Sequence, residues 1–281
     1  EVNLIPRQDE AVADNDFKAG KCDGVFMTAM RARQYNKFAG SIDALGGVPN
    51  NSIAQKAIAY VLDKRNARRL VTKVGGESYE VAGIGQIGSA YIFVKDRSLN
   101  SVAEVKAKKF AVLHYDRAQK QMVERIGAKP VMSDISNFVR KFNSGEVDLV
   151  AAPAYAFKPL EIHKGLGSQG GMIDFPVVNV TADLVLRQDK FPEGYAAQSR
   201  AWFVRQLPKS FAMVKRLEAE IPAKYKVALS KEDQAAYQQL LREGRMDLTA
   251  QGVYDAAMMT VLKKARCTVE RTNFECSLSG E

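Results

Sequence analysis

The chain is poor in histidine and cysteine, with two histidines and three cysteines among 281 residues. The histidines, His114 and His163, are not spaced with carboxylates as metal ligands are, and no C-x-x-C pair occurs. No G-x-S-x-G elbow, Walker A loop or H-E-x-x-H helix is present either. The sequence therefore predicts no metal, no cofactor and no catalytic residues.

Long apolar runs are also missing. None approaches the roughly 18 residues that a membrane-spanning helix needs, so we expect no direct membrane insertion. The numbered chain opens without a signal peptide, which fits a cytosolic protein or a processed one. The net charge of +9 permits contact with anions, but lysine and arginine are spread along the chain without alternating aromatics. This favours a solvated basic surface and predicts no nucleic-acid partner.

The few cysteines still indicate a compartment. Cys267 and Cys276 lie nine residues apart in a polar tail, which predicts a local disulfide and hence an oxidising compartment. The alternative is two exposed, reduced thiols in a cytosolic tail. Cys22 precedes an apolar strand and is predicted to be free and buried.

What the chain does contain is organised around Ser133–Pro159. Helical spacing of apolar residues is followed by a stop at Gly145, a strand at Val147–Ala152 and a tip at Pro153–Tyr155. The segment Lys141–Val150 matches an earlier one in Phe, Gly, Asp and Val at identical spacing. Two such copies predict two similar α/β lobes.

Periodicity and turn signals predict the other elements. Strands are expected at Val2–Ile5, Val25–Thr28, Tyr79–Ala82, Ala90–Val94, Lys109–Leu113 and Val177–Arg187. Helices are expected at Glu10–Lys18, Ser52–Lys64, Asn100–Lys108, Ala118–Ile126, Ala154–Gly165, Gly194–Ile221, Lys231–Gly244 and Thr249–Cys267, with Ala29–Phe38 open between loop and helix.

Two segments, Gly83–Gly88 and Gly165–Gly170, match the dinucleotide fingerprint G-x-G-x-x-G. That motif binds pyrophosphate only where its glycines follow a strand and open a helix. The first segment leads into another strand and the second has no preceding strand, so neither predicts a nucleotide site.

The segment Asp96–Val131, followed by F-N-S-G-E-V-D, resembles the periplasmic solute receptors of TRAP transporters (the DctP type). The stretches FKAGKCDGV, MRARQYNKF, GSIDALGG and FKPLEIHKGLG are similar to a subgroup of solute-binding proteins. Some members of this subgroup carry the label AdeT and are linked by name to aminoglycoside efflux.

The resemblance implies an α/β, two-lobed type II periplasmic-binding-protein fold with a central cleft, hinge strands and a long C-terminal helix. Lobe I is expected at residues 1–92 plus 187–250, lobe II at 93–186, and the C-terminal helix and tail at 251–281. It also implies a periplasmic location, a small-molecule ligand and membrane transporter subunits as partners.

This chain departs from the family in two places. The family's carboxylate-binding arginine is replaced by Ala111; Arg31, Arg33 or Arg117 could substitute for it, but nothing in the sequence requires this. The family also opens with a strand and helix that this chain lacks, which is expected to leave an open sheet edge.

Ligands of parallel α/β sheets gather outside the carboxyl ends of strands, and aromatic side chains suit such sites. The expected ligand-binding residues are Thr28, Arg31, Arg33, Tyr91, Phe93, His114, Tyr115, Asp116, Pro153, Tyr155, Asn179 and Thr181. Two local alternatives stay open: Asp116 as a helix N-cap, and the two early arginines on a helix surface. The alternatives for function are an efflux-associated periplasmic accessory protein and an α/β enzyme such as a transferase.

Overall fold

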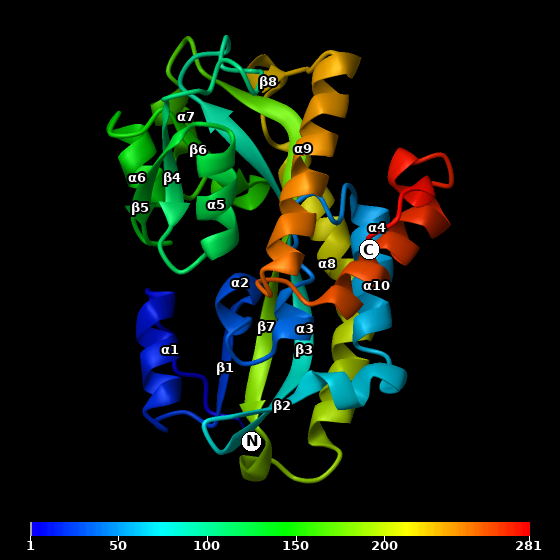
Figure 1. The fold of residues 1–281 in the computed structure, drawn as a ribbon. Coiled ribbons are helices and arrows are strands. Elements are labelled where there is room, and N and C mark those ends of the chain that lie inside the picture. Colours follow the sequence, from blue (N-terminus) through cyan, green and yellow to red (C-terminus); the bar gives the residue numbers. More distant parts are fainter. Residues whose placement is uncertain (1) are drawn as a thin grey trace.

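The computed structural model describes residues 2–281. Its strands are β1 (Gly24–Thr28), β2 (Val71–Val74), β3 (Glu77–Val94), β4 (Lys109–Leu113), β5 (Lys129–Ser133), β6 (Leu149–Pro153), β7 (Gly171–Arg187) and β8 (Lys226–Val227). They form one mixed sheet in the order β1-β7-β3-β6-β4-β5, with β2 beside β3 and β8 beside β7. The antiparallel pair β3 and β7 runs through both α/β lobes (Figure 1). The two-lobed α/β fold predicted from the sequence is confirmed.

Helices cover both lobes and the junction between them (Figure 1). They are α1 (Glu10–Lys18), α2 (Ala29–Ala32), α3 (Lys37–Gly40), α4 (Asn51–Val61), α5 (Arg117–Arg125), α6 (Phe138–Asn143), α7 (Ile162–Leu166), α8 (Tyr195–Ala219), α9 (Lys231–Ala250) and α10 (Ala256–Val269). None of the helices in residues 2–281 combines the length and apolar character that crossing a membrane requires.

The sequence repeat has the same backbone geometry in both lobes. Gly20 follows α1 with φ +72°, and Gly145 follows α6 with φ +81°, a region that glycine enters at little cost. In each copy, the amide after the glycine donates to the carbonyl five residues before it, over 3.0 and 2.9 Å. Phe17 and Phe142, at matching positions, are both fully buried.

The long strands complete this correspondence. β7 pairs antiparallel with β1, and β3 pairs antiparallel with β6. The amide of Arg187, at the end of β7, donates to the carbonyl of Asp23 over 2.9 Å. The amide of Lys95, just beyond β3, donates to the carbonyl of Asp148 over 3.0 Å. Each lobe therefore places its helix–turn–strand unit against the end of one long strand.

The sequence predicts two strands flanking a bend at Gly83–Gly88, but β3 is continuous through these glycines. Register shifts against β7 absorb the irregularity, and Gly88 has φ +128°. A Cβ atom at Gly83 would lie 2.2 Å from the ring of Phe203 in α8, so the glycine permits close helix–sheet packing. The segment opens no helix, so it lacks the strand–turn–helix context in which the fingerprint binds pyrophosphate.

Two further predictions are wrong. Val2–Ile5 forms no strand and is exposed, because no neighbouring strand pairs with it within the described chain. Asn100–Lys108 forms turns instead of a helix. Ala107 there has φ +61°, and its amide donates to the carbonyl of Gly127 over 2.8 Å, a conformation that a helix cannot contain.

Two helical predictions are only partly correct. Ala154–Gly165 divides into a 3₁₀ turn at Ala154–Ala156 and the helix α7. Between them Glu161 has φ +53°, which interrupts the helical backbone. The open segment Ala29–Phe38 contains α2 and the start of α3, separated by a turn.

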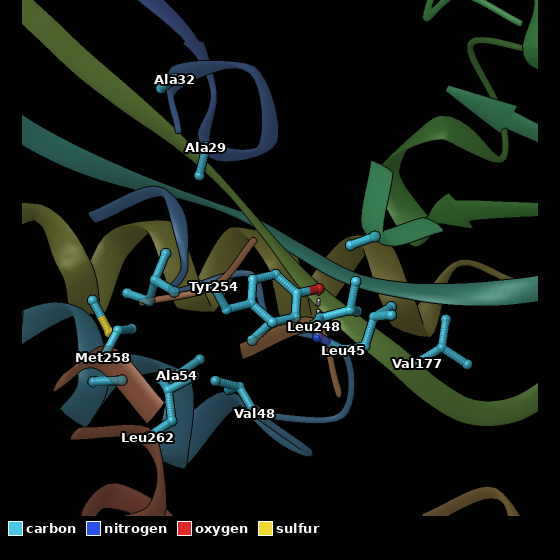
Figure 2. Packing of buried hydrophobic residues seen from close by; sticks show 14 of the residues in the cluster. Ala29, Ala32, Leu45, Val48, Ala54, Val177, Leu248, Tyr254, Met258 and Leu262 are labelled. Atoms are coloured by element: carbon cyan, nitrogen blue, oxygen red, sulfur yellow. Dashed lines mark hydrogen bonds between the residues drawn. The ribbon is translucent and has the colours of Figure 1, made fainter. Parts of the chain in front are cut away.

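Buried apolar side chains form a large core, a smaller one in lobe II, and a third small cluster at Ala82, Leu186 and Ala196. Figure 2 shows Tyr254, between α9 and α10, in the large core beside Leu45, whose amide donates to the tyrosine hydroxyl over 3.4 Å. The smaller core gathers the aromatic residues Phe93, Phe138, Phe142 and Phe157.

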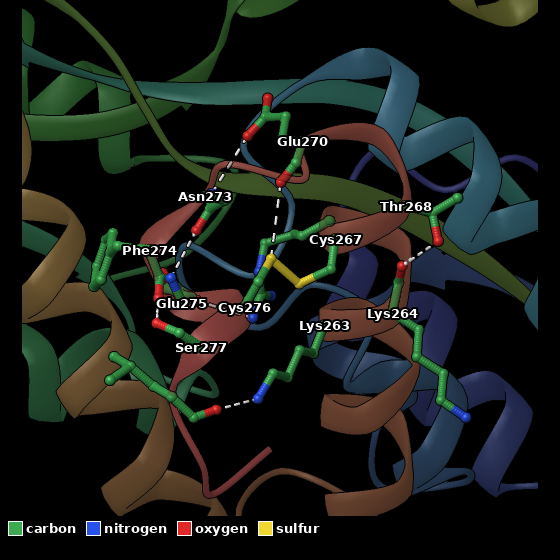
Figure 3. Close-up of a disulfide and its surroundings, with 12 residues drawn as sticks. Lys263, Lys264, Cys267, Thr268, Glu270, Asn273, Phe274, Glu275, Cys276 and Ser277 are labelled. Carbon is green, nitrogen blue, oxygen red and sulfur yellow. Dashed lines mark hydrogen bonds and ion pairs between the residues drawn. A yellow bond between two sulfur atoms is a disulfide. The ribbon is translucent and has the colours of Figure 1, made fainter.

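The tail after α10 is covalently closed. Cys267 and Cys276 form the predicted disulfide (Figure 3). Between them Glu275 accepts from the buried guanidinium of Arg245 over 2.6 Å and forms an ion pair with that of Arg266 at 2.9 Å. Cys22 is free as predicted, but it is half-buried instead of buried. It precedes β1 in a turn whose neighbours are largely exposed.

Candidate functional site

A cavity of about 1220 Å³ is lined by residues of both lobes and by residues 2–8. Its walls are largely apolar. The faces of β3 and β7 that reach it carry Ile87, Ile92, Val178 and Val180. This volume exceeds the range of about 300–1,000 Å³ that is usual for small-molecule sites, so the cavity has room for a solute.

The repeat places equivalent residues of the two lobes on this cavity. Thr28 ends β1 and Pro153 ends β6, each five residues after the aspartate of its repeat. Two residues further on, Met30 and Tyr155 also occupy matching positions. All four line the cavity. The ends of equivalent strands therefore converge, as expected where ligands gather in α/β folds.

Glu10 organises the lobe I side of the cavity. Its carboxylate accepts from the backbone amide of Thr28, from the Thr28 hydroxyl over 3.1 Å and from Nε of Arg31 over 3.0 Å. The guanidinium of Arg31 is buried and lies 3.7 Å from the centre of the Tyr115 ring in lobe II. Burial raises the pKa of the Tyr115 hydroxyl, which has no hydrogen-bond partner within residues 2–281.

Arg33 also makes its polar contacts with other residues of the chain. Its Nε donates to the carbonyl of Gly40 over 2.9 Å, and its guanidinium lies 4.9 Å from the Tyr254 ring centre. Its Nη1 lies 3.7 Å from Oδ1 of Asp116. Asp116 caps α5 by accepting from the amide of Ala118, as the sequence allowed, and also lines the cavity. Burial raises the pKa of Asp116, and the charge of Arg33 partly opposes this.

A buried carboxylate in the turn after α3 interacts with a second one on β7. Asp43, which lines the cavity, accepts from the amide and hydroxyl of Thr181 over 3.1 and 2.6 Å. Asp183 lies two residues further along the same face of β7, fully buried, and neither of its oxygens has a hydrogen-bond partner in the described chain. Burial raises the pKa of Asp43 to about 7 and that of Asp183 well above its ordinary value.

Of the residues expected at the site, Thr28, Asp116, Pro153 and Tyr155 line the cavity and the others do not. On β3, Ala90 and Ile92 reach the cavity, so Tyr91 and Phe93 point to the opposite face because side chains alternate along a strand. Phe93 is fully buried and stacks on Phe157 at 6.1 Å.

The alternation on β7 has the same consequence. Asn179 is hydrogen-bonded to Gln86 over 2.6 and 3.1 Å, and Thr181 to Asp43. His114 is half exposed, with Nδ1 2.7 Å from a carboxylate oxygen of Asp134. Asn179 and Thr181 differ from the prediction because the register of a long strand determines which of its side chains point toward the cavity.

Sequence reasoning missed Glu10, Asp43 and Asp183 as components of this region. A signal exists for Asp43, which stands alone between apolar residues in the run Ile42–Leu45. A carboxylate in such a run is either exposed to solvent or buried with a hydrogen-bond or ion-pair partner. Glu10 looks like an ordinary acidic residue in a first helical turn, so its contact with Arg31 has no local signal.

No arginine reaches the cavity from the strand that carries Ala111. Ala111 itself is buried in the smaller core. Arg117 donates to the side chain of Gln251 over 3.0 Å, on the α9–α10 side. No group of three or more histidine, cysteine or acidic side chains within residues 2–281 could hold a metal ion.

Comparison with known proteins assigns the family. The family model described as Solute-binding protein AdeT 1/2 matches residues 1–281. The chain belongs to this family. It is 43% identical over 281 residues to the "Probable solute-binding protein AdeT1" of Acinetobacter baumannii, covering 100% of this chain and 91% of that protein.

Solved structures with this fold include TRAP periplasmic solute-binding proteins. The protein from Desulfovibrio salexigens with bound orotic acid has a TM-score of 0.72 and 12% identity, covering 94% of this chain and 85% of that one. The protein from Haemophilus influenzae with bound L-gulonate has a TM-score of 0.71 and 12% identity, covering 92% and 84%. At this identity the likeness establishes the fold.

Proposed function

We propose that this member of the AdeT 1/2 family captures a small molecule between its two lobes, in the periplasm, and presents it to membrane transporter subunits. The observation that carries the proposal is the cavity on which Thr28 and Met30 of lobe I converge with Pro153 and Tyr155 of lobe II. The disulfide of the tail is consistent with an oxidising compartment. The protein acts by binding, and its action requires no catalytic residues.

In this proposal Thr28, Asp116, Pro153 and Tyr155 contact the solute. The contact between Arg31 and Tyr115 joins the lobes when they close. Closure involves β3 and β7, which cross from one lobe to the other and carry the bulges that permit bending. The solute stabilises the closed state to the extent that it binds that state more tightly than the open one.

Native mass spectrometry of the freshly purified protein tests the proposal. We expect a retained small molecule that is lost on denaturation, and a fall in the radius of gyration when it is added back. Tyr155→Ala should abolish the ligand-induced rise in Tm. Tyr60→Ala is the matched control, since both side chains are 40% exposed and Tyr60 lies on α4, outside the cavity lining. Turnover of the molecule, or equal effects of the two variants, would contradict the proposal.

A further inference from the structure

We infer that the solute is an uncharged and largely apolar organic molecule. This inference rests on the proposed function and specifies its ligand class. It differs from the chemistry of the two structural neighbours described above, whose bound ligands are orotic acid and L-gulonate.

The first observation is that charged groups of the cavity lining are already paired inside the protein. Glu10 is paired with Arg31, which lies outside the lining, over 3.0 Å. Arg7 and Lys21 also line the cavity, and both are paired with the carboxylate of Asp16, over 2.8 and 3.0 Å. Each of these charges therefore has a partner of opposite sign that belongs to the protein.

The remaining acidic groups of the lining offer no free charge within the cavity either. Asp43 accepts from the amide and hydroxyl of Thr181. Asp116 accepts from a backbone amide of α5 and lies 3.7 Å from Arg33. Burial raises the pKa of the Asp43 and Asp116 carboxyls and so favours their uncharged forms. Asp23 has no side-chain partner within residues 2–281, but it is exposed to water.

This arrangement disfavours a charged solute of either sign. A carboxylate or an ammonium group would lose its hydration in the cavity without meeting an unpaired group of opposite charge. An uncharged solute avoids this cost.

The second observation is the apolar surface that the cavity presents to water. Large apolar side chains line it from both lobes and from the first residues of the chain, with exposed fractions from 40% at Tyr155 to 83% at Leu4. These side chains are Val2, Leu4, Ile5, Phe26, Tyr155 and Leu160. Covering such surface favours binding by about fourfold for each CH₂ group that a ligand buries. The driving force that this cavity supplies is therefore the removal of apolar surface from water.

The test uses N-phenyl-1-naphthylamine, an uncharged fluorescent probe whose emission increases in apolar surroundings. We expect one probe molecule to bind per chain. 1-Octanol should displace it at a concentration about tenfold or more below that of octanoate or octylamine, because these share the eight-carbon chain but carry a charge that lacks a partner. 1-Hexanol, which has two fewer CH₂ groups than 1-octanol, should require a concentration about fifteenfold higher.

A shape-conserving variant locates the probe. Val178→Thr keeps a β-branched side chain on β7 but adds a hydroxyl group to the cavity wall. It should weaken probe binding about fivefold or more, because the bound probe separates this hydroxyl from water. Val74→Thr is the matched control, in the strand β2 and outside the lining, and should bind the probe as the natural protein does.

A second variant reports on binding even where Val178→Thr does not fold. Leu160 lines the cavity and is 41% exposed, so Leu160→Gln leaves the core intact. It removes apolar area from the cavity wall and should weaken probe binding about threefold. Leu278→Gln is the matched control, at a position in the tail that is 39% exposed and outside the lining, and should leave the affinity unchanged.

Each contrary result has a distinct meaning. Equal or tighter binding of octanoate or octylamine than of 1-octanol, or undiminished probe binding by both cavity variants, overturns the inference. If native mass spectrometry instead finds a retained organic acid or amine, the inference fails while the proposed function stands. If no solute is retained and none closes the lobes, the proposed function fails as well.

Discussion

The guanidinium of Arg31 lies 3.7 Å from the centre of the Tyr115 ring and thereby joins lobe I to lobe II. The same guanidinium donates to Glu10, which in turn accepts from the backbone and hydroxyl of Thr28 at the cavity wall. One side chain thus connects the contact between the lobes to the surface that a solute would touch.

A double-mutant cycle on Arg31→Ala and Tyr115→Leu should give a coupling free energy of about 1 kcal/mol in urea unfolding, because a cation over a buried ring is worth about 0.5–2 kcal/mol. The control cycle uses Arg65→Ala and Tyr60→Leu, where the guanidinium lies 5.5 Å from the ring centre and is largely exposed. It should give a smaller value. Equal coupling free energies in the two cycles would show that the buried contact between Arg31 and Tyr115 is no stronger than an exposed one.

The stability of the unliganded protein should fall as the pH rises from about 4 to about 7. Burial raises the pKa of Asp43 from 3.8 to about 7, so the folded protein holds a proton that the unfolded chain has lost in this interval. The free energy of unfolding then decreases with pH by up to about 1.4 kcal/mol per pH unit for one proton.

Urea unfolding at several pH values between 4 and 8 measures this slope. Asp43→Asn should make the slope shallower, because the amide does not titrate, while Asp116 and Asp183, whose pKa values burial also raises, still contribute. The exposed variant Asp189→Asn should keep the slope of the natural protein. A rise in stability across this interval would show that Asp43 is ionised and paired in the folded state.

The disulfide between Cys267 and Cys276 should stabilise the protein by about 3 kcal/mol in the chain-entropy model for a loop of this length. Replacing both cysteines by serine should lower the free energy of unfolding by about this amount. Alkylation of the unfolded, unreduced protein should label Cys22 alone. Labelling at three positions would mean that the bond is not formed in the isolated protein.

Gly20→Ala and Gly145→Ala should each cost about 1 kcal/mol of stability, since an L-residue is disfavoured at the positive φ of these turns. A Cβ atom at Gly20 would meet nothing within 4 Å, so the cost there is conformational and not steric. Gly20→Asn should cost less, because asparagine tolerates the left-handed region better. Urea unfolding measures all three, and an alanine variant as stable as the natural protein would contradict this account.

Much of the local structure follows from the sequence alone. The helix Glu10–Lys18 and the strand Lys109–Leu113 have the predicted bounds. The sequence also predicted the repeated glycine turns and the disulfide of the cysteine pair. These features depend on residues a few positions apart, whose periodicity, capping and turn conformations act locally. The two-lobed fold followed from the repeat and from the family resemblance.

Tertiary structure decided which side chains face the cavity. The register of β3 against β7 turned Ile92 and Val180 toward it and Phe93 and Thr181 away. Partners distant in the chain engaged the two arginines expected to bind a solute, since Glu10 pairs with Arg31 and Asp116 lies near Arg33. The glycines of β3 remain in a strand because β7 supplies hydrogen bonds along it. The physical reason is the same throughout: long-range pairing and burial determine these outcomes, and local sequence does not encode which distant residue will be the partner.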